Sequence, residues 1–184
     1  MPVVAHWPAA VADATMGPPA LPPLFHLGWV VRDRDATIED LSARLGAGPF
    51  QVLTETSRFE HALVRGRPGP FELRIAFGLL GGVVLALLEP LDAASPHAEF
   101  LASHGEGLHH LAYLVPDLDA ALRDATAATP PLELLVDGTG ADNPIRWAYL
   151  EGGAAHGTVV ELIERSPVAE AAFADVLALL ELGR

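Results

Sequence analysis

The chain lacks two residue types that would widen its chemistry. Its 184 residues include no cysteine, which excludes disulfides, thiolate nucleophiles and thiolate metal ligands. All 11 basic residues are arginine, so no lysine is present to form a Schiff base or to act as a general base. The sequence also has no apolar run of the roughly 18 residues that a membrane-spanning helix needs. We therefore expect no membrane partner and a chemistry carried by other side chains.

Positive charge is scarce as well. The formal net charge is −13 at pH 7, which disfavours nucleic acid and anionic membrane surfaces as partners. An arginine-lined pocket could still bind a small anionic substrate. Residues 1–23 lack the basic segment that begins a signal peptide, so we expect a cytoplasmic protein. The same residues are rich in Ala and Pro without any period, which predicts a flexible N-terminal extension.

One stretch of the chain occurs twice. The segment HLGWVVRDRDATIED, from His26, aligns without a gap with HLAYLVPDLDAALRD, from His110. In each segment apolar and polar residues first alternate, as in a strand, and apolar residues then recur at helical spacing. The similarity extends further, because LRIAF resembles IRWAY and VLALLE resembles VVELIE in later strands. The sequence therefore predicts two modules of common ancestry.

Each module reads as a strand, a helix and three strands, an α+β fold. We predict strands over 25–33, 49–55, 61–65, 71–77, 83–89, 108–115, 132–136, 145–150 and 158–163. We predict helices over 35–45, 97–103, 117–128 and 169–182, the first capped by Asp35 and ended by Gly46. The expected units are a first module (24–92), a connector (93–106), a second module (107–165) and a C-terminal helix (166–184).

Strand alternation assigns side chains to two faces. We place the bulkier side of each strand under the helices. The other face then collects six polar residues, namely His26, His110, Glu161, Glu72, Arg74 and Arg146. We expect His109 to pack beside Tyr113 on the helix side. Four further histidines are expected in solvent, namely His61, His97, His104 and His156.

Three of the inward residues form a candidate metal site. An ionised Glu161 within VVELIE is costly to bury unless it is paired or bound to a cation. Two neutral imidazoles, His26 and His110, beside that carboxylate suit Fe(II), Mn(II), Co(II) or Zn(II). The two arginines, Arg74 and Arg146, could hold a substrate carboxylate or phosphate by paired hydrogen bonds, or form ion pairs at the rim.

The chain resembles the vicinal oxygen chelate superfamily, which includes glyoxalase I, methylmalonyl-CoA epimerase, extradiol dioxygenases and fosfomycin-resistance proteins. The resemblance covers about residues 24–164. It is closest to the methylmalonyl-CoA epimerase and glyoxalase-like branch, on the run LLEPLDAASPHAEFLASHGEGLHHLAYLVPDLDAAL and on VVELIER. It implies two βαβββ modules whose sheets curve into a cup, with helices outside.

The resemblance also implies a ligand set and a base. One divalent metal ion (Fe, Mn, Co, Zn or Ni) would be held by His26, His110 and Glu161. A fourth ligand position falls on Ala86, which has no donor atom. Glu72 resembles the catalytic base of the epimerase branch in position. The sequence leaves open whether the modules pair within one chain or across an expected homodimer.

Three functions are compatible with this set. The first is a lyase or isomerase that chelates two oxygens of a small substrate and stabilises an enolate, with Glu72 or Glu161 moving the proton. The second is an Fe(II)-dependent extradiol-type dioxygenase, which the open position at Ala86 favours. The third is a non-enzymatic small-molecule binding or resistance protein.

Overall fold

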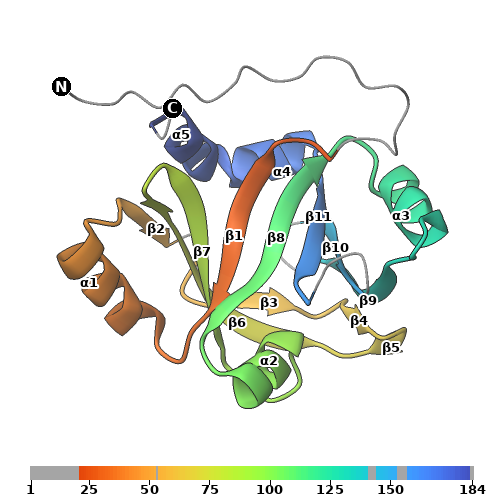
Figure 1. Ribbon diagram of the computed structural model, residues 1–184, viewed down its shortest axis with the longest axis horizontal. Helices are drawn as coiled ribbons and strands as arrows, with labels where there is room; N and C mark the ends of the chain where they lie inside the picture. The colour runs from red at the N-terminus through yellow and green to blue at the C-terminus, as the bar shows by residue number, and fades with distance from the viewer. Residues whose placement is uncertain (1–20, 53, 141–143, 153–156, 183–184) are drawn as a thin grey trace.

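One strongly curved sheet dominates the computed structural model (Figure 1), which describes residues 21–52, 54–140, 144–152 and 157–182. The sheet has 11 strands, and their order is β2-β6-β7-β1-β8-β11-β10-β9-β4-β5, with β3 paired to β6. The strands of the first half are β1 (Leu24–Val30), β2 (Phe50–Val52), β3 (Ser57–Phe59), β4 (Leu63–Val64), β5 (Arg67–Pro68), β6 (Phe71–Leu80) and β7 (Val83–Pro90). Those of the second half are β8 (Gly107–Val115), β9 (Glu133–Thr139), β10 (Arg146–Glu151) and β11 (Val159–Glu164).

The helices lie around this sheet. They are α1 (Arg34–Leu45), α2 (Pro96–His104), α3 (Leu118–Ala127), α4 (Pro167–Ala172) and α5 (Ala174–Leu182). Figure 1 shows α1 and α3 at opposite sides of the sheet, with α4 and α5 across one end and α2 near the other. The predicted α+β class with outer helices is confirmed. Residues 1–20 of the predicted extension lie outside the described residues.

The two halves of the sheet join within one chain through β1 and β8. These strands are antiparallel, and each is flanked by a parallel strand, β7 beside β1 and β11 beside β8. In the central ladder His26 lies opposite Ala112, and Gly28 lies opposite His110. This register places the two copies of the repeated segment side by side in the sheet. The two modules therefore pair within one chain, which the sequence had left open.

An excursion from the first half completes the sheet. Strands β3, β4 and β5 come between β2 and β6 in the sequence. Strand β4 pairs with β9 of the second half, with Leu63 opposite Asp137. The strand predicted over 61–65 is therefore short, and β3 was not predicted. Neither β3 nor β4 exceeds three residues, which is too short for alternation to give a clear signal.

The two outer helices begin in the same way. Asp33 caps α1 by accepting from the amide of Ala36 at 2.9 Å, and Asp117 caps α3 by accepting from Ala120 at 2.8 Å. The predicted cap at Asp35 is wrong by two positions, because that carboxylate binds arginine side chains instead. Gly46 ends α1 in the left-handed conformation, as predicted.

The C-terminal helix is broken at Phe173. The chain leaves helical geometry there, between α4 and α5, and the Phe173 ring packs edge-on against Phe25 and Phe77 inside the cup. Val176 and Leu179 of α5 are buried in the same core. No helix of the described residues is long and apolar enough to cross a membrane.

The predicted faces are wrong for β6 and β10. In the β6–β7 ladder Phe77 lies opposite Ala86 and Ile75 opposite Leu88, and directly opposed residues share a face. The bulky side of β6 therefore faces the interior of the cup, together with Ala86 and Leu88. The assignment failed because it took every bulky face to be a helix-packing face, whereas the cup has an apolar wall of its own.

The helix-packing core lends itself to a stability test. Leu87 is fully buried beneath α1 beside Ile38 and Leu41, away from the cup. We expect Leu87→Ala to lower the free energy of unfolding by about 2–5 kcal/mol, because it leaves a cavity. Leu45→Ala is the control, since Leu45 is 63% exposed, and it should change stability by about 0.5 kcal/mol or less. Urea denaturation followed by circular dichroism measures both, and equal losses would contradict this packing.

Candidate metal centre

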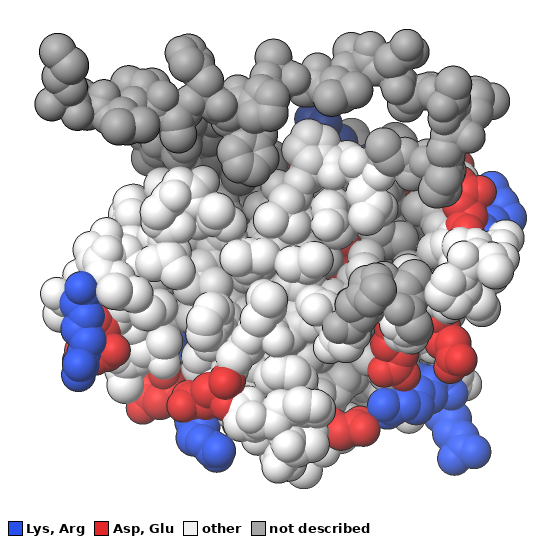
Figure 2. Space-filling view, in the orientation of Figure 1, with Lys and Arg blue, Asp and Glu red and all other residues white. Residues whose placement is uncertain are grey.

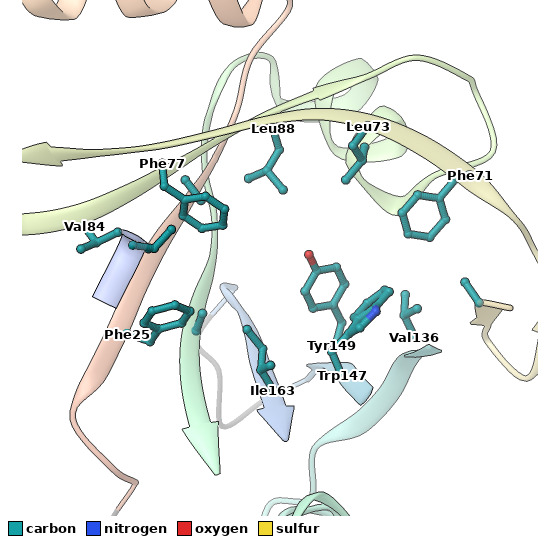
Figure 3. Close-up of a cluster of buried hydrophobic side chains, with 14 of the residues drawn as sticks. Phe25, Phe71, Leu73, Phe77, Val84, Leu88, Val136, Trp147, Tyr149 and Ile163 are labelled. Atoms are coloured by element: carbon teal, nitrogen blue, oxygen red, sulfur yellow. The ribbon is translucent and has the colours of Figure 1, made fainter. Parts of the chain in front are cut away.

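The cup encloses a cavity of about 390 Å³. Its walls are mostly aromatic and aliphatic, and Figure 3 shows Tyr149, Trp147 and Ile163 facing Phe71, Leu73, Leu88 and Phe77 across it. Thr54, Thr56, Ser57 and Arg58 line the same space. This volume lies at the lower end of the range for small-molecule sites.

Three polar side chains converge on this apolar wall. Nε2 of His26 lies 3.2 Å from Nε2 of His110, and Oε2 of Glu161 lies 3.2 Å from the first and 3.3 Å from the second. His26 and His110 are 3% and 0% exposed, and Glu161 is 8% exposed. The structure thus brings together the three residues that the repeat singled out.

The register of the sheet explains why a fourth donor is missing. Glu161 lies opposite Ala112, two residues beyond His110, in the β8–β11 ladder. Ala86 lies opposite Gly28, two residues beyond His26, in the β1–β7 ladder. Ala86 therefore occupies the position in the first half that Glu161 occupies in the second, and it lines the cavity with a methyl group.

Gly28 makes room for the centre. A Cβ atom at this position would lie 2.0 Å from Nε2 of His110, far inside contact distance. The imidazole of His110 therefore lies directly over the backbone of the neighbouring strand. Only glycine at this position lets that ring reach the donor cluster.

The arrangement fits a divalent cation. Oε2 of Glu161 is buried and has no hydrogen-bond partner among the described residues, which is costly for a carboxylate in an apolar wall. Burial, with neighbouring histidines, holds the pKa of His110 well below its ordinary value, so its imidazole is neutral at pH 7. Donors bound at about 2.0–2.2 Å to one ion lie roughly 3.0–3.5 Å apart, which is the spacing found here.

Tyr149 connects the carboxylate to a buried histidine that was predicted to lie in solvent. Its hydroxyl lies 3.0 Å from Nε2 of His97, and burial and the Glu161 carboxylate raise the Tyr149 pKa well above its ordinary value. His97 is fully buried, and burial lowers its pKa well below its ordinary value. The prediction for His97 is wrong because α2 turns this side chain into the cup, and nine residues of helix give too little periodicity to show it.

A second buried histidine contacts the centre from behind. Nδ1 of His109 lies 3.0 Å from Nδ1 of His110. Its ring packs edge-on against Phe100 and Tyr149, and burial lowers its pKa to about 4. His61 and His104 are exposed, as predicted, while His156 lies outside the described residues.

Three residues predicted to face the cavity point away from it. Arg74 binds Asp35 at 2.6 Å and Glu89 at 3.2 Å, and these contacts raise its pKa. Arg146 makes the repeat-related pair with Asp119 of α3 at 2.7 Å and with Glu164 at 3.4 Å.

Glu72, the predicted base, pairs with Arg58 at 3.0 Å and is half exposed. The predicted inward placement of Glu72, Arg74 and Arg146 is wrong because β6 and β10 present their aromatic side to the cup. The two arginines instead fasten α1 and α3 to the outside of the sheet.

The fold is that of a known superfamily. Residues 25–132 match the Glyoxalase/Bleomycin resistance protein/Dioxygenase superfamily, and the chain belongs to it.

Two solved structures of methylmalonyl-CoA epimerases are similar to the chain. The enzyme from Mycobacterium tuberculosis is 28% identical, with a TM-score of 0.55 over 80% of this chain and 91% of that one. The Streptomyces coelicolor enzyme in complex with 2-nitronate-propionyl-CoA is 29% identical, with a TM-score of 0.56 over 81% of this chain and 98% of that one. These likenesses agree with the branch that the sequence resembles.

A curated relative is similar over a shorter length. The uncharacterized protein YqjC of Bacillus subtilis is 36% identical over 93 residues, which are 50% of this chain and 66% of that protein. The match thus spans just under two thirds of the relative.

The role of Gly28 can be tested directly. We expect Gly28→Ala to displace the His110 ring and to weaken Co²⁺ binding strongly, because the new Cβ would overlap Nε2. Gly46→Ala is the matched control: a Cβ there meets no atom within 4 Å, but the residue has a φ of 65°. It should cost about 1 kcal/mol of stability and leave Co²⁺ affinity unchanged. Isothermal titration calorimetry measures the Co²⁺ affinity of both variants. An unchanged Co²⁺ affinity in Gly28→Ala would exclude the close approach described here.

Proposed function

We propose that the protein is a metal-dependent isomerase of the epimerase type. Its substrate would be a small oxygenated acyl compound with two oxygens placed to chelate. The observation that carries the proposal is the convergence of His26, His110 and Glu161 within 3.3 Å of one another on the wall of an apolar cavity. The similarity to methylmalonyl-CoA epimerases favours the isomerase over a lyase.

Each polar group of the cavity has a distinct part in this proposal. A divalent cation held by the three donors would supply Lewis acidity toward a substrate oxygen. Glu161 is the proton carrier, because Glu72 lies on the outer face and Glu161 is the carboxylate among the described residues that line the cavity. Tyr149, whose pKa is raised by burial and by the Glu161 carboxylate, stays protonated and orients that carboxylate.

The cavity wall indicates which part of a substrate enters. Phenylalanine, leucine and isoleucine side chains surround the centre, so an acyl or ring portion of low polarity is favoured there. Arg58, with Thr54, Thr56 and Ser57, supplies charge and hydroxyl groups along the same space. A thioester substrate would place its acyl part beside the metal-binding residues and the polar group on its sulfur against Arg58 and the three hydroxyl residues. The guanidinium of Arg58 suits an anionic group on that part of the substrate.

Proton exchange at carbon is the direct test. We expect the protein loaded with Co²⁺, Mn²⁺, Zn²⁺ or Fe²⁺ to exchange the hydrogen next to the carbonyl of methylmalonyl-CoA, or of another 2-substituted acyl thioester, in D₂O. Proton NMR follows the loss of signal. His110→Ala and Glu161→Gln should slow the exchange by about 100-fold or more, since losing even an outer partner of a metal ligand costs about 10–100-fold.

Glu72→Gln is the matched control for this experiment. Glu72 is absent from the residues that line the cavity and pairs with Arg58. The variant should therefore keep the wild-type turnover at saturating substrate, even if releasing Arg58 changes the substrate affinity, and a large loss of turnover would restore the predicted role of Glu72 as base. Oxygen consumption with catechols in the Fe²⁺-loaded protein, without exchange of acyl substrates, would replace the proposal by the dioxygenase alternative. Ligand binding unaffected by His110→Ala would favour the non-enzymatic binder.

We also propose that the protein is a homodimer joined through the outer face of β1 and β8. Helices α1 and α3 leave this face open (Figure 1), and Figure 2 shows it largely uncharged, with acidic and basic side chains along the lower rim. Leu24, Trp29 and Leu108 on these strands are 37%, 37% and 42% exposed. Apolar patches rimmed by charge are typical of protein interfaces.

A charge placed on this face should separate the dimer. We expect Trp29→Glu to convert a dimer to a monomer in light scattering coupled to gel filtration, because the interface would have to bury an unpaired carboxylate. Leu45→Glu places the same charge on an exposed residue of α1, outside the face, and should leave the mass unchanged. A wild-type monomer at micromolar concentration would rule the dimer out.

A further inference from the structure

We infer that His109 is a positioning residue, which fixes the proton of the His110 imidazole on Nδ1 and so keeps Nε2 free to bind a cation. The inference rests on the proposed metal centre. It concerns a residue behind that centre rather than one of its ligands.

The first step is the proton inventory of the His110 ring. A neutral imidazole carries one proton, and the nitrogen that lacks it has the lone pair that binds a metal. Nε2 of His110 faces Nε2 of His26 and the Glu161 carboxylate, so the ligand form requires the proton on Nδ1. That atom lies 3.0 Å from Nδ1 of His109. In the ligand form, His110 Nδ1–H donates to the lone pair of His109 Nδ1, whose own proton is then on Nε2.

The second step is the rigidity of the acceptor. His109 is 3% exposed. Its ring centroid lies 5.1 Å from that of Phe100 and 4.8 Å from that of His97, both on α2. Side chains of α2 therefore hold the His109 ring in place. The hydrogen bond to this fixed ring then orients the His110 ring. Partners of this kind orient metal ligands and raise their basicity.

The internal repeat supplies the comparison. Phe25 precedes His26 as His109 precedes His110, so the first half has a phenyl ring where the second has an acceptor. Nδ1 of His26 is correspondingly buried without a hydrogen-bond partner among the described residues. The two ligand histidines are thus alike on the cavity side and different behind it. Packing alone could be served by phenylalanine in both halves. The hydrogen-bond acceptor that His109 provides in the second half therefore indicates a role beyond packing.

The test measures the affinity of the full-length protein for Co²⁺ by chelator competition and by the visible Co²⁺ spectrum. His109→Phe copies the first half, and it should lower Co²⁺ affinity roughly 10- to 100-fold. His109→Asn returns an acceptor oxygen close to the place of Nδ1, and it should recover most of the loss. Equal Co²⁺ affinity for wild type and His109→Phe, or equal losses for both variants, would overturn the inference.

Phe100→Leu controls for packing. It loosens the contact with the His109 ring but keeps the acceptor, so Co²⁺ affinity should match wild type even if the unfolding midpoint falls. An affinity loss as large as that of His109→Phe would assign the effect to packing and refute the hydrogen bond.

The tautomer itself can be read in the metal-free wild-type protein. Long-range ¹H–¹⁵N correlation spectra should show His110 with a protonated Nδ1 and an unprotonated Nε2, and the opposite assignment would overturn the inference even if the variants failed to fold. A wild-type protein that binds none of the divalent cations would instead defeat the proposed function. The tautomer measurement would still decide the role of His109.

Discussion

The antiparallel pairing of β1 with β8 is the constraint on which the rest of the structure depends. It brings His26 and His110, which are 84 positions apart, to a ring-nitrogen separation of 3.2 Å. Ala112 lies opposite His26 and Gly28 lies opposite His110, and both residues are small enough to leave room for the rings. Parallel strands flank this pair, and β11, which pairs with β8, carries Glu161 to the same point.

The sheet also separates charge from the cavity. Its outer side carries two repeat-related ion-pair clusters, in which Arg74 and Arg146 fasten the helices through Asp35 and Asp119. Its inner side is aromatic and aliphatic apart from the histidines, the carboxylate and the polar residues of one rim. In such surroundings an unpaired carboxylate is costly, so the apolar wall favours a cation beside Glu161. The net charge of the chain has little bearing on this local balance.

The duplicated segment made most of the fold predictable. It indicated two βαβββ halves, the positions of α1 and α3, and the three residues that meet in the cup, because alternation placed His26, His110 and Glu161 on the inner face. It put Phe25 under the helices, whereas this ring packs with Phe77 and Phe173. The same reasoning failed for β6 and β10, where bulky side chains line a cavity rather than a helix interface. His97 and Tyr149 were missed for related reasons, since a short helix and an inverted strand face gave no periodic signal toward the site.

The sequence by itself determined the repeat, the class of fold and a compact list of donor residues, because these depend on local periodicity and on the chemistry of side chains. Only the tertiary structure decided that the halves join within one chain, that Glu72 lies outside the cup, and that His97 and Tyr149 reach the site. Those outcomes depend on strand register, in which a shift of one residue turns every side chain to the opposite face. The contact between His109 and His110 belongs to the same category, because packing by α2 fixes the rotation of the His109 ring.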